Sequence, residues 1–326
     1  MTASEGTYAE SRLCSVISKA NGEDPVGSAT PFDRCLMVEV EAPWEGDVTD
    51  SRFFPEGLRE VVADARDRGL LDKFTAIMPD SEYSREGHTR FLHFRRPPGP
   101  FARYEKDDFL VPDADLVSAV EALFAGPDEL ARFERYRQQT SRVREIMVCT
   151  HGGRDACCGK FGFPFYCTLR QEYAAPGTLR VWRSSHIGGH RFAPTLMDLP
   201  EGRYWGHLEP EAVENFVLRG GPASDLTRFY RGWAGLGTKF EQIAEREILA
   251  REGWAWTEHP KTGRVLLEDD GRVEVRIEYE APDGALPGAY EATVEPTGSV
   301  STLESSGTAP LSEVELYGVT RLKRVP

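Results

Sequence analysis

The stretch REIMVCTHGGRDACCGKFG, residues 144–162, decides the fold of this chain. REIMVCT is apolar and predicts a strand that runs into Cys149, followed by a glycine-rich loop and a helix from about Ala156 to Tyr173. Further on, LRVWRSS predicts a strand, HIGGH a turn, FAPTLMDLP and RYWGHL two extended segments, and EPEAVENFVLRG a helix. Strand, helix, strand, strand pair and helix is the element order of a thioredoxin-like unit.

The block upstream, roughly residues 12–125, also alternates between helix and strand. CLMVEVEAPW, FTAIMPD and TRFLHFRR predict strands. FFPEGLREVVADARDRGLL and VPDADLVSAVEALFAG predict helices, the second with Asp113 as its N-terminal cap. Alternating elements of this kind are typical of α/β layers. A polar helix over 127–142 is predicted to connect this block to the next.

The end of the chain has a different pattern. Residues 223–253 read as helical, whereas GRVLLEDDGRVEVRIEYEAPDG alternates apolar and polar residues across an Asp-Gly turn, which predicts a hairpin. We therefore predict an α/β fold in three parts. These are an N-terminal α/β region over 1–142, interpreted as a degenerate thioredoxin-like unit, a thioredoxin-like domain over 143–253, and a small antiparallel β appendage over 254–326.

Composition excludes several classes of function. The 326 residues are 40% hydrophobic and 28% charged, which is ordinary for a soluble globular protein. The net charge of −14 repels phosphate backbones and argues against nucleic-acid binding. No apolar stretch is long enough for a membrane span, and the start MTASEG lacks the features of a secretory signal. We expect a cytoplasmic protein.

The spacing of certain cysteines and histidines predicts a metal-binding site. Eight residues separate Cys149 from Cys158, and three separate His186 from His190. The strand end and the helix start are predicted to bring the two thiols to one place, and the Ile-Gly-Gly turn could bring both imidazoles there. Two thiolates and two imidazoles fit either a tetrahedral structural zinc or a [2Fe–2S] cluster. The eight-residue separation is long for a zinc site and modestly favours the cluster.

Alternatives remain for individual residues. Cys157 is the second choice for the ligand position given to Cys158. A thiol–disulfide oxidoreductase that uses Cys157 or Cys158 is a further alternative, ranked last because the chain lacks a C-x-x-C pair. Cys167 reads as a core residue, and His151 as either a neighbour of the ligands or a loop residue. The remaining cysteines and histidines carry no spacing signal and read as structural: Cys14, Cys35, His88, His93, His207 and His259.

CTHGGRDACCGKFG followed by SSHIGGHRFAPTLMDLPEGRYWG resembles the sucrase/ferredoxin-like family, a branch of the thioredoxin-like [2Fe–2S] ferredoxins. CSVISKANGEDPVGSATPFDRCLMVEVEAPW is also similar, so the resemblance covers about residues 12–250. In relatives with a fungal representative, a C-x8-C pair and an H-x3-H pair hold the cluster. The resemblance therefore implies Cys149, Cys158, His186 and His190 as the cofactor and metal ligands.

The resemblance implies a one-electron carrier rather than a catalyst, and no catalytic residues are assigned. Imidazole ligands in place of thiolates raise the potential to roughly −150 to +300 mV, against about −400 mV for plant-type clusters. Reduction should be coupled to protonation of a ligand histidine. The expected partner is a flavin-dependent or ferredoxin-type reductase. No carboxylate pair indicates sucrose hydrolysis.

Overall fold

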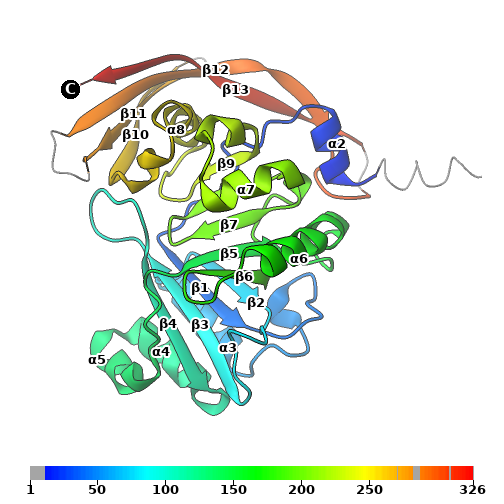
Figure 1. Cartoon of the computed structure of the whole chain (residues 1–326), viewed down its shortest axis with the longest axis vertical. Coiled ribbons are helices and arrows are strands. Elements are labelled where there is room, and N and C mark those ends of the chain that lie inside the picture. The colour runs from blue at the N-terminus through cyan, green and yellow to red at the C-terminus, as the bar shows by residue number, and fades with distance from the viewer. Residues whose placement is uncertain (1–11, 270, 282–286, 308–309, 326) are drawn as a thin grey trace, which may run out of the picture.

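The computed structural model of the protein describes residues 12–269, 271–281, 287–307 and 310–325. Within them, one mixed sheet has nine strands in the order β4-β3-β1-β2-β6-β5-β7-β8-β9, and a second has four antiparallel strands, β10 to β13. Figure 1 shows the large sheet along the length of the molecule and the small one at one end. The α/β class and the small C-terminal antiparallel sheet are confirmed.

The strands are β1 Arg34–Glu39, β2 Lys73–Ile77, β3 His88–Arg95, β4 Glu105–Pro112, β5 Arg144–Cys149, β6 Leu179–Ser184, β7 Leu196–Leu199, β8 Arg203–Trp205, β9 Tyr230–Trp233, β10 Lys261–Asp269, β11 Arg272–Tyr279, β12 Gly288–Thr302 and β13 Ser312–Val325. The α-helices are α2 Cys14–Ala20, α3 Leu58–Asp67, α4 Leu116–Ala125, α5 Pro127–Leu130, α6 Phe163–Glu172, α7 Pro210–Leu218 and α8 Lys239–Glu252. No helix among the described residues is long and apolar enough to cross a membrane.

The large sheet consists of two units with the same strand arrangement. In the first, β1 and β2 are parallel around α3, β3 pairs antiparallel with β1, and β4 pairs with β3 before α4. In the second, β5 and β6 are parallel around α6, β7 pairs antiparallel with β5, and β8 pairs with β7 before α7. The units join where Ile77 of β2 pairs with Ser184 of β6. The single sheet crosses the predicted boundary at residue 142, and the three-domain division stays a prediction.

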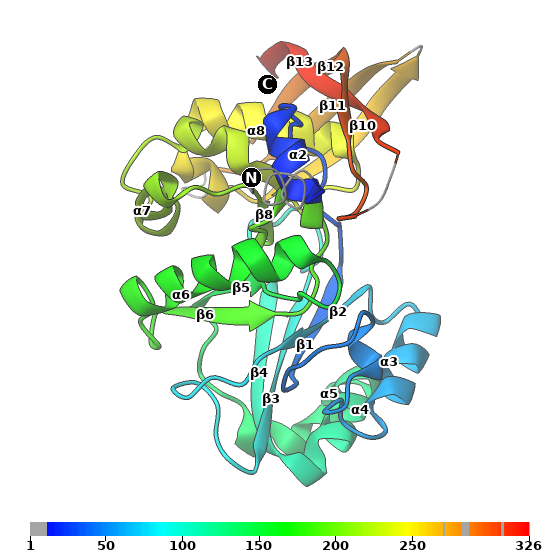
Figure 2. The same ribbon diagram turned by 90° about the vertical axis from the view of Figure 1, so that its right-hand side faces the viewer.

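The small sheet covers α8, as Figure 1 shows. In β11 the buried residues recur at every second position, Val273, Val275, Ile277 and Tyr279. This period of two places one face of the strand against the core beneath it. The segment that follows β12 turns back beside α2, the short N-terminal helix (Figure 2), where the amide of Cys14 donates to Ser306 Oγ at 3.3 Å.

The predicted continuous helix over residues 223–253 is wrong. A 3-10 helix over Ala223–Phe229 leads into strand β9, and α8 starts only at Lys239. Gly232 has a φ of +136°, which L-residues rarely adopt, and an added Cβ there would lie 2.4 Å from Gln242 Oε1. Pairing with β8 therefore overrides the local helical pattern. Asp113 caps no α-helix, because α4 begins after Asp115 without a side-chain cap.

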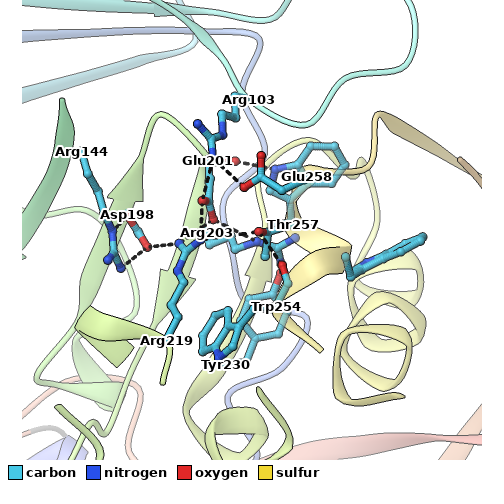
Figure 3. A network of polar contacts seen from close by, with 12 residues as sticks. Arg103, Arg144, Asp198, Glu201, Arg203, Arg219, Tyr230, Trp254, Thr257 and Glu258 are labelled. Atoms are coloured by element: carbon cyan, nitrogen blue, oxygen red, sulfur yellow. Dashed lines mark hydrogen bonds and ion pairs between the residues drawn. The ribbon is translucent and has the colours of Figure 1, made fainter. Parts of the chain in front are cut away.

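A buried ionic network ties the second unit to α8, and Figure 3 shows two of its members, Arg203 and Tyr230, among the neighbouring polar contacts. Arg203 of β8 is 1% exposed and donates to Glu245 Oε1 at 2.9 Å. Tyr230 and Trp256 also donate to the Glu245 carboxylate, at 2.7 and 2.9 Å. Burial acts to raise the pKa of Glu245, but Arg203 and Lys261 hold it below its usual value. Glu245 is therefore an ionised acceptor at the centre of the core, and its donors come from separate elements.

Acid should destabilise the fold through His207. Burial lowers the pKa of His207 to about 4, and its ring is hydrogen-bonded to Ser18 of α2 at 3.2 Å. The unfolded chain binds this proton near pH 6.5, so stability is present above that pH and is lost as the pH falls toward 4. We expect a loss of about 2 kcal/mol between about pH 7 and pH 5 from this residue. Urea unfolding of the H207N variant, whose asparagine tolerates the φ of +53°, should lack this part of the pH dependence. Equal pH slopes in the two proteins would contradict the assignment.

Candidate metal centre

The loop after β5 brings the two predicted thiol ligands together. Cys149 is the last residue of β5, and Cys158 begins a π-helix over Cys158–Gly162 that continues into α6. Both side chains are fully buried. The predicted helix therefore exists, but its first turn is a π-helix, a feature frequent at functional sites. An added Cβ at Gly162 would lie 1.9 Å from the Cys149 carbonyl oxygen, so this turn can pack against the strand end only with glycine there.

Alanine at position 162 should therefore displace the thiol loop. We expect G162A to lose about 3 kcal/mol of unfolding free energy, because backbone atoms rather than a flexible side chain oppose the new methyl group. Urea denaturation monitored by circular dichroism measures this loss. G177A is the matched control, since nothing lies within 4 Å of a Cβ at Gly177. Equal stabilities for the two variants would refute the close packing.

Three of the four predicted ligands converge. His186 Nδ1 lies 3.9 Å from Cys149 Sγ and 3.8 Å from Cys158 Sγ, and the three atoms lie within 4.8 Å of one another. Hydrogen bonding from Cys158 lowers the pKa of Cys149 well below its usual value against the opposing effect of burial, and His186 adds to the lowering. The same contact raises the pKa of Cys158. Of the two thiols, Cys149 is therefore the more readily deprotonated.

His190 lies beside this group rather than within it. Its ring centroid is 5.4 Å from that of His186. Its Nε2 lies 2.7 Å from the backbone oxygen of Glu304, which can only accept, so Nε2 carries the proton. Nδ1 is buried and has no hydrogen-bond partner among the described residues. A histidine that donates one ring N–H to a carbonyl and keeps the other nitrogen free is arranged as metal ligands are.

This donor set fits a metal centre. Two ligands of one tetrahedral zinc, one sulfur and one nitrogen, lie about 3.6 Å apart, close to the distances from His186 to the two sulfurs. In a two-cysteine, two-histidine [2Fe–2S] centre, by contrast, the histidines bind the iron that the cysteines do not hold. His190 Nδ1 is an unpartnered buried nitrogen beside this group, but the close grouping that includes His190 is formed with Cys14 and Asp155.

His151 supports His186. It is 2% exposed, its Nε2 donates to the backbone oxygen of Glu45 at 2.6 Å, and its Nδ1 accepts from the amide of His186 at 3.2 Å. Burial lowers the pKa of His151, in keeping with a neutral ring that donates on one side and accepts on the other. The sequence left its role open. Of the two interpretations, the structure favours a neighbour that fixes the backbone of a candidate ligand.

Two cations, the buried Arg231 and the half-buried Lys73, lie against the turn between the histidines. Arg231 donates to the carbonyl of Gly188 at 2.9 Å and to that of Ser28 at 2.6 Å, and Lys73 donates to the carbonyl of Ile187 at 3.2 Å. Burial lowers the pKa of Arg231 to about 10 and also lowers that of Lys73. Among the described residues neither forms an ion pair with a carboxylate. Their charge therefore favours an anionic occupant of the site. Sequence spacing gave no signal for either residue.

Cys157 points elsewhere. Its sulfur lies 3.6 Å from that of Cys14, in a second group with Asp155 and Ser306. This arrangement favours Cys158 over Cys157 as the ligand. Cys167 is half-buried in α6 and, like Cys35, belongs to neither group. Sequence reasoning missed the role of Cys14 because its neighbours in the fold are distant in the chain.

Comparison with known proteins identifies a family whose match includes the candidate metal centre. Residues 25–232, more than half of the chain, match the family described as sucrase/ferredoxin-like. The chain is also 27% identical over 103 residues to "Altered inheritance of mitochondria protein 32" of the yeast Meyerozyma guilliermondii, a match that covers 27% of this chain and 36% of that protein. The chain thus spans only about a third of that relative. No solved structure matches the chain.

Proposed function

The chain belongs to the sucrase/ferredoxin-like family, and from that premise we propose that it is a one-electron carrier with a [2Fe–2S] cluster. Cys149 and Cys158 would hold one iron, and His186 and His190 the other. The observation that carries the proposal is the state of His190, whose Nε2 proton is fixed by Glu304 while its buried Nδ1 has no partner in the part of the chain that the structure describes. Buried polar atoms are normally hydrogen-bonded, so an unpartnered Nδ1 is unusual for a histidine with a purely structural role.

The topology supports the thioredoxin-like part of the proposal. The second unit runs strand, helix, strand, strand pair and helix, with the candidate ligands at or after the ends of β5 and β6. The first unit repeats that order without a cysteine–histidine group. Because no such group occurs among the residues of this unit that the structure describes, we interpret the unit as a degenerate copy.

A bound [2Fe–2S] cluster supplies one-electron transfer, at roughly −150 to +300 mV with two histidine ligands. The residues of this chain act on that chemistry through charge and position. Arg231 and Lys73 stabilise the additional negative charge of the reduced state. His151 and Glu304 fix the two candidate histidines. The proposal includes coupling of reduction to proton uptake, a flavin-dependent or ferredoxin-type reductase as partner, and a cytoplasmic location.

A structural zinc site is the second candidate. It is favoured by the approach of His186 Nδ1 to both sulfurs, at 3.8 and 3.9 Å, which matches ligands of a single ion. Zinc has no redox chemistry, so the protein would then not be an electron carrier. Metal analysis separates the two candidates directly.

Cysteine at position 186 or 190 tests the ligand set and the function together. A thiolate adds negative charge to the site, so we expect H186C and H190C each to lower the midpoint potential by about 100 mV or more and to weaken its dependence on pH. Spectroscopic redox titration at several pH values measures both effects. H259C, which changes a histidine outside both groups, is the control. Unchanged potentials in both ligand variants would remove the histidines from the ligand set.

A further inference from the structure

A second pair of thiols lies next to the candidate centre. Cys14 of α2 and Cys157 of the thiol loop are both fully buried, are 143 positions apart in the chain, and place their sulfur atoms 3.6 Å from each other. Ser306, after β12, contacts both sulfurs through its hydroxyl, at 3.4 Å from Cys14 and 3.2 Å from Cys157. Three distant segments thus meet at one dithiol, in the region where Figure 2 shows α2 beside the end of the small sheet.

The groups around the dithiol are already engaged, which argues against a second metal ion. Asp155 and His190 lie near Cys14, close enough for a shared ion. However, Asp155 Oδ1 accepts from Ser306 Oγ at 2.7 Å and from the amide of Cys157 at 2.8 Å, and Oδ2 accepts from the amide of Ser306 at 2.9 Å. His190 Nε2 donates to Glu304, and the proposed function uses its Nδ1 as a cluster ligand. Among the described residues, no uncommitted carboxylate or imidazole then remains for a metal ion held by the two thiols.

We propose that Cys14 and Cys157 form a reversible disulfide that covalently joins α2 to the loop carrying Cys158. The oxidant is a hydroperoxide. One thiol takes oxygen from hydrogen peroxide to give a sulfenic acid and one water. The second thiol attacks that sulfur, so that the S–S bond forms, the S–O bond breaks and a second water leaves. Two electrons pass from the sulfurs to the peroxide, and a small dithiol reverses the step.

Access to the pair requires only local opening. The helix that carries Cys14 has seven residues and lies at the start of the described chain. Short terminal elements open at much lower free energy than the core does. The disulfide would close a loop of more than a hundred residues, and we expect it to raise the midpoint of thermal unfolding by about 5 °C. The inference does not depend on which metal the candidate centre holds.

Peptide mapping tests the proposal on the full chain as purified. The protein is treated with hydrogen peroxide, its free thiols are blocked with N-ethylmaleimide, and it is digested without reduction. We expect a linked peptide that joins the segment of Cys14 to the segment of Cys157 and Cys158 and that disappears after treatment with dithiothreitol. Recovery of Cys14 and Cys157 as blocked free thiols after oxidation would overturn the proposal.

Substitutions identify the sulfurs. C14S and C157S should lose the linked peptide and the thermal shift, whereas C158S and C35S should keep the link. A link that persists in C157S would overturn the assignment. The wild-type map remains decisive if a serine variant does not fold. Iron is measured in the same samples to separate the disulfide proposal from the electron-transfer proposal. A Cys14–Cys157 link in a protein without iron would support the disulfide and count against electron transfer.

Discussion

If the proposed cluster is present, serine in place of Cys149 or Cys158 is expected to abolish iron binding. Both sulfurs are buried and face His186, and a serine hydroxyl at these positions cannot supply a thiolate ligand. Even changes to residues that only support ligands reduce metal affinity by about 10- to 100-fold, so we expect C149S and C158S to lose at least that much. Iron and acid-labile sulfide assays on protein purified without oxygen measure the loss.

Two further cysteines are controls for that prediction. C167S changes a half-buried thiol of α6 that belongs to neither cysteine group, and it should retain its iron. C157S should also retain it, because the Cys157 sulfur faces Cys14. Full iron content in C158S together with its loss in C157S would exchange the two ligand assignments. Full iron content in both C149S and C158S would exclude the candidate centre.

The Glu245→Gln variant is expected to have the largest effect on stability. The carboxylate is fully buried, neutralises Arg203, and accepts from Tyr230 and Trp256. Glutamine has nearly the same shape but removes the carboxylate nearest to the buried Arg203 guanidinium, which keeps only the more distant Glu201, 3.6 Å from its Nε. Removal of one partner of a buried ion pair costs about 3–5 kcal/mol, and we expect a loss of that size in urea denaturation.

An exposed ion pair provides the matched comparison. Asp64 and Arg68 lie one helical turn apart on α3, with a distance of 2.8 Å and more than half of each side chain exposed. D64N should therefore change the free energy of unfolding by less than about 0.5 kcal/mol. A loss below about 1 kcal/mol in E245Q would show that the network does not hold the second unit against α8.

Local patterns predicted the centre of the site. Cys149 ends β5 and His186 lies two residues after the end of β6, and because these strands are adjacent and parallel the two candidate ligands lie together. The alternation of β11 likewise predicted which of its side chains are buried. In these places the spacing of residues in the chain determines their spacing in the fold.

The surroundings of the site could not be predicted in this way. Ser306 meets Cys14 across 292 positions, and Glu304 meets His190 across 114. Arg231 belongs to β9, a strand that the local pattern reads as helix because its pairing with β8 is a tertiary effect. The pattern of residues within one segment cannot predict contacts between segments that are far apart in the chain. The four candidate ligands could therefore be proposed from the sequence. The residues that hydrogen-bond them or place positive charge beside them could be recognised only from the structure.

Metal analysis of the intact protein tests the central claim most directly. Protein purified without oxygen should contain iron and acid-labile sulfide in equal amounts, about two of each per chain, with visible charge-transfer bands that fade on reduction. Zinc should be absent or far below one per chain. A colourless protein with one zinc and no iron would contradict the account and make Cys149, Cys158, His186 and His190 a structural clasp.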